Sequence, residues 1–190
     1  MTAISNLLRA SADRAVPVLD AVTDDQLDAA TPCAGFRVGD LVNHLFQVVV
    51  NFQSLARREV ADFSGTPDVL GTDWRARFAA ETDALVQAWT PESVLAGVSP
   101  GMGLPQPAVG RMALLDLTLH PWDLAVATGL PYAPDPAAVA ELLTMVDEMG
   151  PRAREWKVFG EQVPVAADAD PFTRLLGGTG RDPHWRRPSA

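Results

Sequence analysis

Residues 114–129 read LLDLTLHPWDLAVATG, and this stretch decides the fold because it is apolar on almost every side. A helix with this pattern is buried all round, so we expect it at the centre of the molecule. It is predicted to cover about residues 107–128 and to end at Gly129. Asp116 and His120 lie within it, and a buried carboxylate or imidazole is costly unless it has a partner.

The spacing of apolar residues predicts further helices along the chain. The clearest has one apolar stripe over residues 38–55, and others are expected at residues 4–22, 74–89 and 136–149. Short connections between long helices indicate an antiparallel bundle. We therefore expect an all-α fold, an antiparallel four-helix bundle with an extra C-terminal helical segment.

The other segments are less regular. Residues 94–106 are rich in Gly and Pro and are expected to form a loop with a small β-hairpin. Residues 151–190 are expected to form a less regular tail that packs on the bundle, with one helical turn in DPFTRLLGG. Because no internal repeat is present, residues 1–190 are predicted to form a single domain.

The composition excludes several classes of function. A net charge of -9 argues against binding to nucleic acid or to anionic membranes, which require clustered basic residues. No apolar run is long enough to span a membrane, and the N-terminus lacks the apolar segment of a signal peptide. The single cysteine, Cys33, excludes an internal disulfide and fits a reducing compartment. We expect a cytoplasmic protein, and its abundant alanine with one lysine, Lys157, suggests a high-GC bacterial source.

Asp116 and His120 are four residues apart, so they project from the same side of the predicted helix, about 40° apart around its axis. One helix offers two ligands to one metal ion in this way in the zinc-binding H-E-x-x-H pattern. A carboxylate and an imidazole suit a divalent transition metal, Zn²⁺ and Ni²⁺ included. The pair alone also fits a buried histidine that is hydrogen-bonded by a neighbouring aspartate.

His44 lies at the margin of the apolar stripe of residues 38–55, where a side chain points into the seam between helices. Two helices of one bundle can thus bring His44, Asp116 and His120 together. Three protein ligands leave positions open for water or substrate, which is typical of a catalytic metal site. The alternative is a histidine at the rim of the bundle with its tip in water.

Three blocks of the sequence resemble a known family, and they are TPCAGFRVGDLVNHL (31–45), DLTLHPWDLAVATG (116–129) and DPFTRLLGGTGRDPHW (170–185). Their order and spacing are similar to the actinobacterial DinB-like family of metal-binding proteins, which includes the mycothiol-dependent maleylpyruvate isomerases and related thiol transferases. The resemblance covers almost the whole chain. It implies a DinB-like four-helix bundle in which a histidine of the second helix and a later acid-x-x-x-His pair hold a divalent metal. The matching residues here are His44, Asp116 and His120.

The chain departs from the family pattern at two positions. Relatives commonly have Gly after the metal-binding histidine and Ser or Thr capping the second helix, where this chain has Pro121 and Arg37. We expect Pro121 to kink the helix and to re-aim His120, or else to mark a site that is drifting out of use. Maleylpyruvate isomerases also have an additional C-terminal domain, for which this chain is too short, so isomerase activity itself is in doubt.

Three neighbouring residues have competing interpretations. Asp123 is a candidate to orient the His120 imidazole by a hydrogen bond, and the alternatives are a cap or a surface ion pair. Cys33 is either a reactive thiol or a small buried residue that packs the turn before the second helix. His184 follows Pro183 near the C-terminus, where we expect it to be exposed and outside the site.

The resemblance implies a divalent-metal-binding protein, with Zn or Ni as the metal, that acts as a mycothiol-dependent thiol transferase or isomerase on a small electrophile. The expected partners are the small-molecule thiol, the electrophile and a second copy in a homodimer, with no nucleic acid or membrane. Two alternatives stay open. One is a non-catalytic metal- or thiol-binding module, a sensor or store, and the other is a structural bundle with no metal.

Overall fold

The computed structural model describes residues 2–71 and 73–188, and over these residues it is helical with no strand. The α-helices are α1 (Ala3–Ala21), α2 (Val38–Ala56), α3 (Trp74–Ala88), α4 (Gln106–Thr128), α5 (Pro136–Glu155) and α6 (Pro171–Gly178). Two short 3₁₀ helices, η1 (Asp24–Gln26) and η2 (Glu92–Leu95), lie in the connections. The predicted all-α fold is confirmed. Among the helices described, none is both long and apolar enough to cross a membrane.

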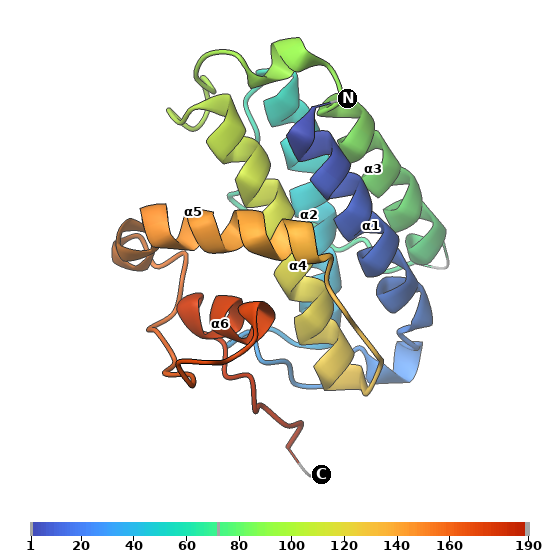
Figure 1. Cartoon of the computed structure of the whole chain (residues 1–190). Helices are drawn as coiled ribbons and strands as arrows, with labels where there is room; N and C mark the ends of the chain where they lie inside the picture. The colour runs from blue at the N-terminus through green and yellow to red at the C-terminus, as the bar shows by residue number, and fades with distance from the viewer. Residues whose placement is uncertain (1, 72, 189–190) are drawn as a thin grey trace.

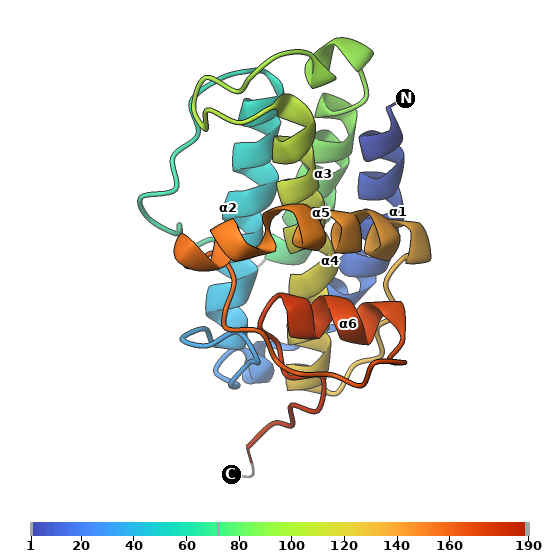
Figure 2. The same cartoon turned by 60° about the vertical axis from the view of Figure 1, so that its left-hand side comes forward.

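Helices α1 to α4 form the bundle (Figure 1, Figure 2). Helices α3 and α4 lie on opposite sides of the pair formed by α1 and α2, and each packs against both of these helices. At one end Thr2 Oγ1 donates to Trp89 O over 2.9 Å, and Gln106 Nε2 donates to Leu55 O over 3.0 Å. The start of α1 therefore meets the end of α3, and the start of α4 meets the end of α2. Consequently α1 and α4 run in one direction, while α2 and α3 run in the other. The helix directions do not simply alternate along the chain. The connection between α2 and α3 runs back along the length of the bundle, so α3 starts at the same end as α2.

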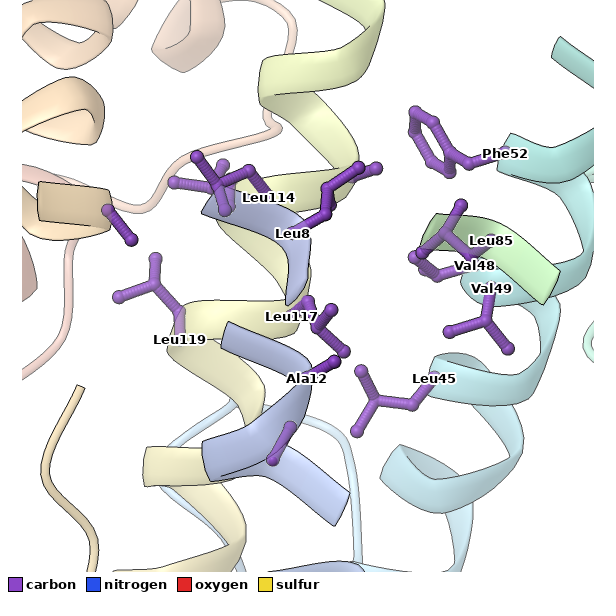
Figure 3. Packing of buried hydrophobic residues seen from close by; sticks show 14 of the residues in the cluster. Leu8, Ala12, Leu45, Val48, Val49, Phe52, Leu85, Leu114, Leu117 and Leu119 are labelled. Carbon is purple, nitrogen blue, oxygen red and sulfur yellow. The ribbon is translucent and has the colours of Figure 1, made fainter. Parts of the chain in front are cut away.

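The core is apolar and is shared by all four bundle helices (Figure 3). Leu8 of α1, Leu45 of α2, Leu85 of α3 and Leu117 of α4 are all fully buried. As predicted, α4 is buried on nearly every side. Burial of each such side chain stabilises the fold by roughly 1.5–3 kcal/mol relative to exposure, so this core accounts for the bundle.

Specific residues define the ends of the helices. The side chain of Asp135 accepts hydrogen bonds from the N–H groups of Ala137 and Ala138, so Asp135 is the N-cap of α5. Gly129 ends α4 with a φ of 75°, a left-handed conformation that suits glycine. At the start of α2, Arg37 is not a capping side chain. Its backbone N–H instead donates to the Asp40 carboxylate over 2.9 Å.

Two expectations about the irregular segments need correction. The β-hairpin predicted near residues 94–106 reduces to one isolated bridge between Val98 and Pro105, because proline has no N–H with which to extend a ladder. The fifth helix was expected to end at residue 149, yet α5 continues through Pro151 to Glu155. Residues 151–155 of the predicted tail are therefore helical.

The C-terminal elements pack on one side of the bundle. Helix α5 lies across α4 in both views, and α6 lies beside α5 (Figure 1, Figure 2). Arg154 near the end of α5 donates from Nη1 to Gly178 O, the last residue of α6, over 3.1 Å. This contact ties the two helices together at the point where the chain turns back toward α4.

We expect Gly110→Ala to destabilise the protein by about 1–3 kcal/mol through overpacking. A Cβ at residue 110 would lie 2.9 Å from Cζ3 of the buried Trp89 and 3.0 Å from Cγ1 of Ile4. Gly150→Ala is the matched control, because a Cβ there would approach no atom closer than 3.3 Å, the distance to Arg154 Nη2, and alanine has the better helix propensity. Chemical denaturation measures both variants, and equal stability of the two would contradict the close packing of α4 on Trp89.

Candidate metal centre

Helices α2 and α4 bring His44, Asp116 and His120 together in the seam between them. One turn separates Asp116 from His120 on α4, and the His120 Nε2 atom lies 3.4 Å from Asp116 Oδ1. The His44 ring, from the first half of α2, lies edge-on to the His120 ring with a centroid distance of 4.9 Å and an angle of 89°. One potential ligand atom from each residue falls within 4.8 Å of the other two.

The 3.4 Å separation of His120 Nε2 and Asp116 Oδ1 is compatible with two ligands of one metal ion. An N–H···O hydrogen bond spans about 2.7–3.2 Å, so the contact of His120 Nε2 with Asp116 is long for one. Two ligand atoms that each lie about 2.0–2.1 Å from a tetrahedral zinc ion are themselves separated by about 3.3 Å. The donor set of two imidazoles and one carboxylate, with its spacing, therefore fits a divalent transition metal.

These three side chains line a cavity of about 780 Å³. Side chains of α2 and α4 give it an apolar wall that includes Val48, Phe52 and Leu115. The opposite wall comes from the C-terminal part of the chain and includes Arg154, Lys157, Phe159 and Arg181. The volume is within the range of about 300–1,000 Å³ that is usual for small-molecule sites.

The local electrostatics favour a cation at this point. Burial disfavours the charge on Asp116, but contact with His120 and the nearby His44 hold the pKa of its carboxyl below the ordinary value. Burial also disfavours the His120 imidazolium, yet Asp116 and Asp123 raise its pKa above the ordinary value. The pKa of His44 is lowered, mainly by burial, which keeps this imidazole neutral as a metal ligand must be.

Asp123 lies behind His120, on the side away from Asp116. Its side chain is fully buried, and Oδ2 lies 2.9 Å from His120 Nδ1, so the predicted hydrogen bond is present. Arg181 holds the same carboxylate: Nε lies 3.2 Å from both oxygens and Nη2 lies 3.0 Å from Oδ2. Burial opposes the charge on Asp123, but Arg181 and His120 hold its pKa below the ordinary value. The imidazole is thus supported from behind by an ion pair.

Cys33 belongs to a second group with His120 and Asp123, whose potential ligand atoms also lie within 4.8 Å of one another. This group suits a metal less well because the guanidinium of Arg181 already neutralises Asp123. Burial and the nearby Asp123 raise the pKa of the Cys33 thiol to about 11, although Arg181 opposes the shift. The thiol is therefore protonated near neutral pH, as expected for the buried alternative rather than for a reactive cysteine.

Arg181 is the residue of this site that reasoning from the sequence missed. It stands in an irregular segment, and one arginine there has no periodic pattern to mark it. The usable signal was Asp123, since a fully buried carboxylate on an apolar helix requires a donor or a cation. His184 is exposed, as expected, and is not among the residues that line the cavity.

Comparison with known proteins shows the family of the chain. The family model described as "Mycothiol maleylpyruvate isomerase N-terminal domain" matches residues 8–125, and the chain belongs to this family. Two uncharacterized proteins from two strains of Mycobacterium tuberculosis are each 28% identical to it over 178 residues, covering 89% of this chain and 92% of the relative. No solved structure matches the chain. His44, Asp116, His120 and Asp123 lie within the matched residues, whereas Arg181 lies beyond them.

We expect Cys33 to react slowly with iodoacetamide in the metal-free protein, because little of the thiol is ionised when its pKa is about 11. Compared with an ordinary cysteine of pKa near 8.5, alkylation at neutral pH should be slower by at least ~100-fold. Mass spectrometry of the intact protein gives the rate, and the denatured protein gives the rate of an accessible thiol. Similar rates in the two states would identify Cys33 as a reactive thiol after all.

Proposed function

We propose that this member of the mycothiol maleylpyruvate isomerase N-terminal domain family binds a divalent metal, Zn or Ni, through His44, Asp116 and His120. We further propose that it transfers mycothiol, a low-molecular-weight thiol, to a small electrophile or uses the thiol to isomerise it, in the cytoplasm. The observation that carries the proposal is that three ligand groups from two helices face one cavity at metal-ligand spacing. Family membership supports the identity of the thiol.

The number and kind of donors support a catalytic rather than a structural ion. Three protein ligands leave at least one coordination position for a thiol or a water molecule, whereas structural zinc sites have four protein ligands. When bound, the ion supplies a Lewis acid that lowers the pKa of a thiol and so favours the nucleophilic thiolate. Asp116 lines the cavity with 25% of its side chain exposed, so a ligand in the cavity could reach an ion held by this carboxylate.

The residues of the chain supply orientation and shape. Asp123 fixes the ring of His120, and Phe36 lies against His44 with a ring-centroid distance of 5.7 Å. Both imidazoles are thus held in place before a ligand arrives, which lowers the cost of assembling the site. The apolar wall of the cavity, with Val48 and Leu115, excludes water from one side of the bound molecules and protects a thiolate from hydration.

Elemental analysis of the untagged protein tests the metal site. We expect about one divalent ion per chain in the wild type and loss of the ion in His44→Ala, because a two-ligand remnant binds weakly. His184→Ala removes the exposed histidine and is the matched control, which should keep the ion. Circular dichroism checks that each variant is folded. A wild-type protein that takes up neither Zn²⁺ nor Ni²⁺ would favour the structural bundle without metal.

A conjugation assay tests the thiol chemistry. Mycothiol is mixed with a panel of small electrophiles, and loss of free thiol is followed with metal-loaded protein, metal-free protein and metal-loaded His184→Ala. We expect the metal-loaded wild type and the control variant to accelerate conjugation of at least one electrophile, because the metal raises the fraction of thiolate. If loaded protein binds mycothiol yet is no faster than the metal-free protein, the chain is a binding module rather than an enzyme.

A further inference from the structure

The C-terminal segment positions the guanidinium of Arg181 behind His120, next to the candidate metal centre. Gly180 has a φ of 86°, and a Cβ there would lie 2.6 Å from the Cα of Gly160, so only glycine fits this turn. The next backbone N–H, that of Arg181, donates to Leu176 O over 2.8 Å. These constraints direct the Arg181 side chain toward α4, where 14% of it remains exposed at the cavity.

Arg181 engages both oxygens of Asp123. The Nε atom lies 3.2 Å from each oxygen, and Nη2 lies 3.0 Å from Oδ2. A buried ion pair offsets its desolvation cost only when its geometry is good and both partners are hydrogen-bonded. An arginine that donates two or more hydrogen bonds to one carboxylate meets this condition. Because the guanidinium charge lies against both oxygens, it favours the ionised carboxylate, which can only accept a hydrogen bond from His120.

This constraint decides which nitrogen of His120 carries the proton. Asp123 Oδ2 lies 2.9 Å from His120 Nδ1, whereas the Arg181 Nη2 donor lies farther from the same nitrogen, at 3.4 Å. The closer acceptor favours a proton on Nδ1 of the neutral ring. The lone pair then belongs to Nε2, the atom that lies 3.4 Å from Asp116 Oδ1. If Asp123 were instead the donor, Nε2 would carry the proton and could not bind a metal.

We propose that Arg181 is a positioning residue of the metal centre, which keeps Asp123 as an acceptor and thereby sets His120 with its proton on Nδ1 and its lone pair on Nε2. The proposed function supplies the consequence for metal binding, whereas the tautomer is a property of the metal-free protein. Arg181 lies outside the residues matched by the family model. The tail of this chain therefore completes a centre whose ligands all come from the bundle.

The first test needs no metal. The ¹⁵N shifts of the His120 ring nitrogens in the metal-free wild type, followed with rising pH until the ring has lost its charge, report the tautomer directly. We expect the proton on Nδ1. Arg181→Gln removes the positive charge and the guanidinium hydrogen bonds to Asp123. In this variant the spectrum should shift toward a mixture of the two His120 tautomers. A wild-type proton on Nε2, or an unchanged tautomer in Arg181→Gln, would overturn the proposal.

The second test measures affinity for Zn²⁺ by competition with a chromophoric chelator. Arg181→Gln and Asp123→Asn should each weaken binding by about 10- to 100-fold, the usual effect of losing an outer partner of a metal-bound histidine. The double variant should lose no more than the worse single variant, because both residues act through His120. Arg174→Gln, which removes an exposed arginine on α6, is the control and should bind as the wild type does.

The possible outcomes distinguish a failure of the proposed role of Arg181 from a failure of the proposed function. Additive losses in the double variant, or unchanged affinity in a folded Arg181→Gln, would reduce Arg181 to a structural ion-pair partner. Arg181→Lys keeps the charge without the guanidinium and should recover part of the affinity and of the Nδ1 tautomer. If no variant or wild type binds Zn²⁺ or Ni²⁺, the proposed function fails, but the change of tautomer between the wild type and Arg181→Gln still tests the role of Arg181. If Arg181→Gln does not fold, Arg181→Lys takes its place in both tests.

Discussion

The structure depends on partners for three ionisable side chains in the second half of α4, where most of the surrounding residues are apolar. Asp116, His120 and Asp123 lie within two turns of α4, and Asp123 is fully buried. Such groups are tolerated in a core only when each has a partner, and α4 alone cannot supply enough of them. The partners come from elsewhere: His44 from α2 on one side and Arg181 from the C-terminal segment on the other.

This requirement links the fold to the site. Because α2 and α4 run in opposite directions against each other, the first half of α2 faces the second half of α4, and His44 meets His120 there. The C-terminal segment then closes the opposite side of the cavity, with α5 crossing α4 and the turn after α6 reaching Asp123. The C-terminal segment therefore supplies the partner of Asp123 and also forms one wall of the cavity next to the candidate metal site.

Much of this arrangement could be predicted from the sequence, because periodic patterns report which side of a helix is buried. The apolar stripes located the bundle helices, and the four-residue spacing of Asp116 and His120 placed them on one side of α4. The parallel course of α2 and α3 could not be predicted in this way, since the 57–73 connection has no pattern that reveals its path. Arg181 was missed for a similar reason, because its partner is 58 residues away in sequence and its segment is irregular. Contacts of that kind depend on tertiary packing rather than on local spacing.

The central claim is that His44, Asp116 and His120 converge on one divalent ion. Anomalous X-ray diffraction from crystals of zinc-loaded protein, collected on both sides of the zinc absorption edge, tests it most directly. The account predicts one strong peak about 2.0–2.2 Å from an atom of each of the three side chains, with the zinc-facing atom of His120 being Nε2. A peak beside Cys33 and His120 Nδ1, or the absence of any peak in the seam between α2 and α4, would contradict it.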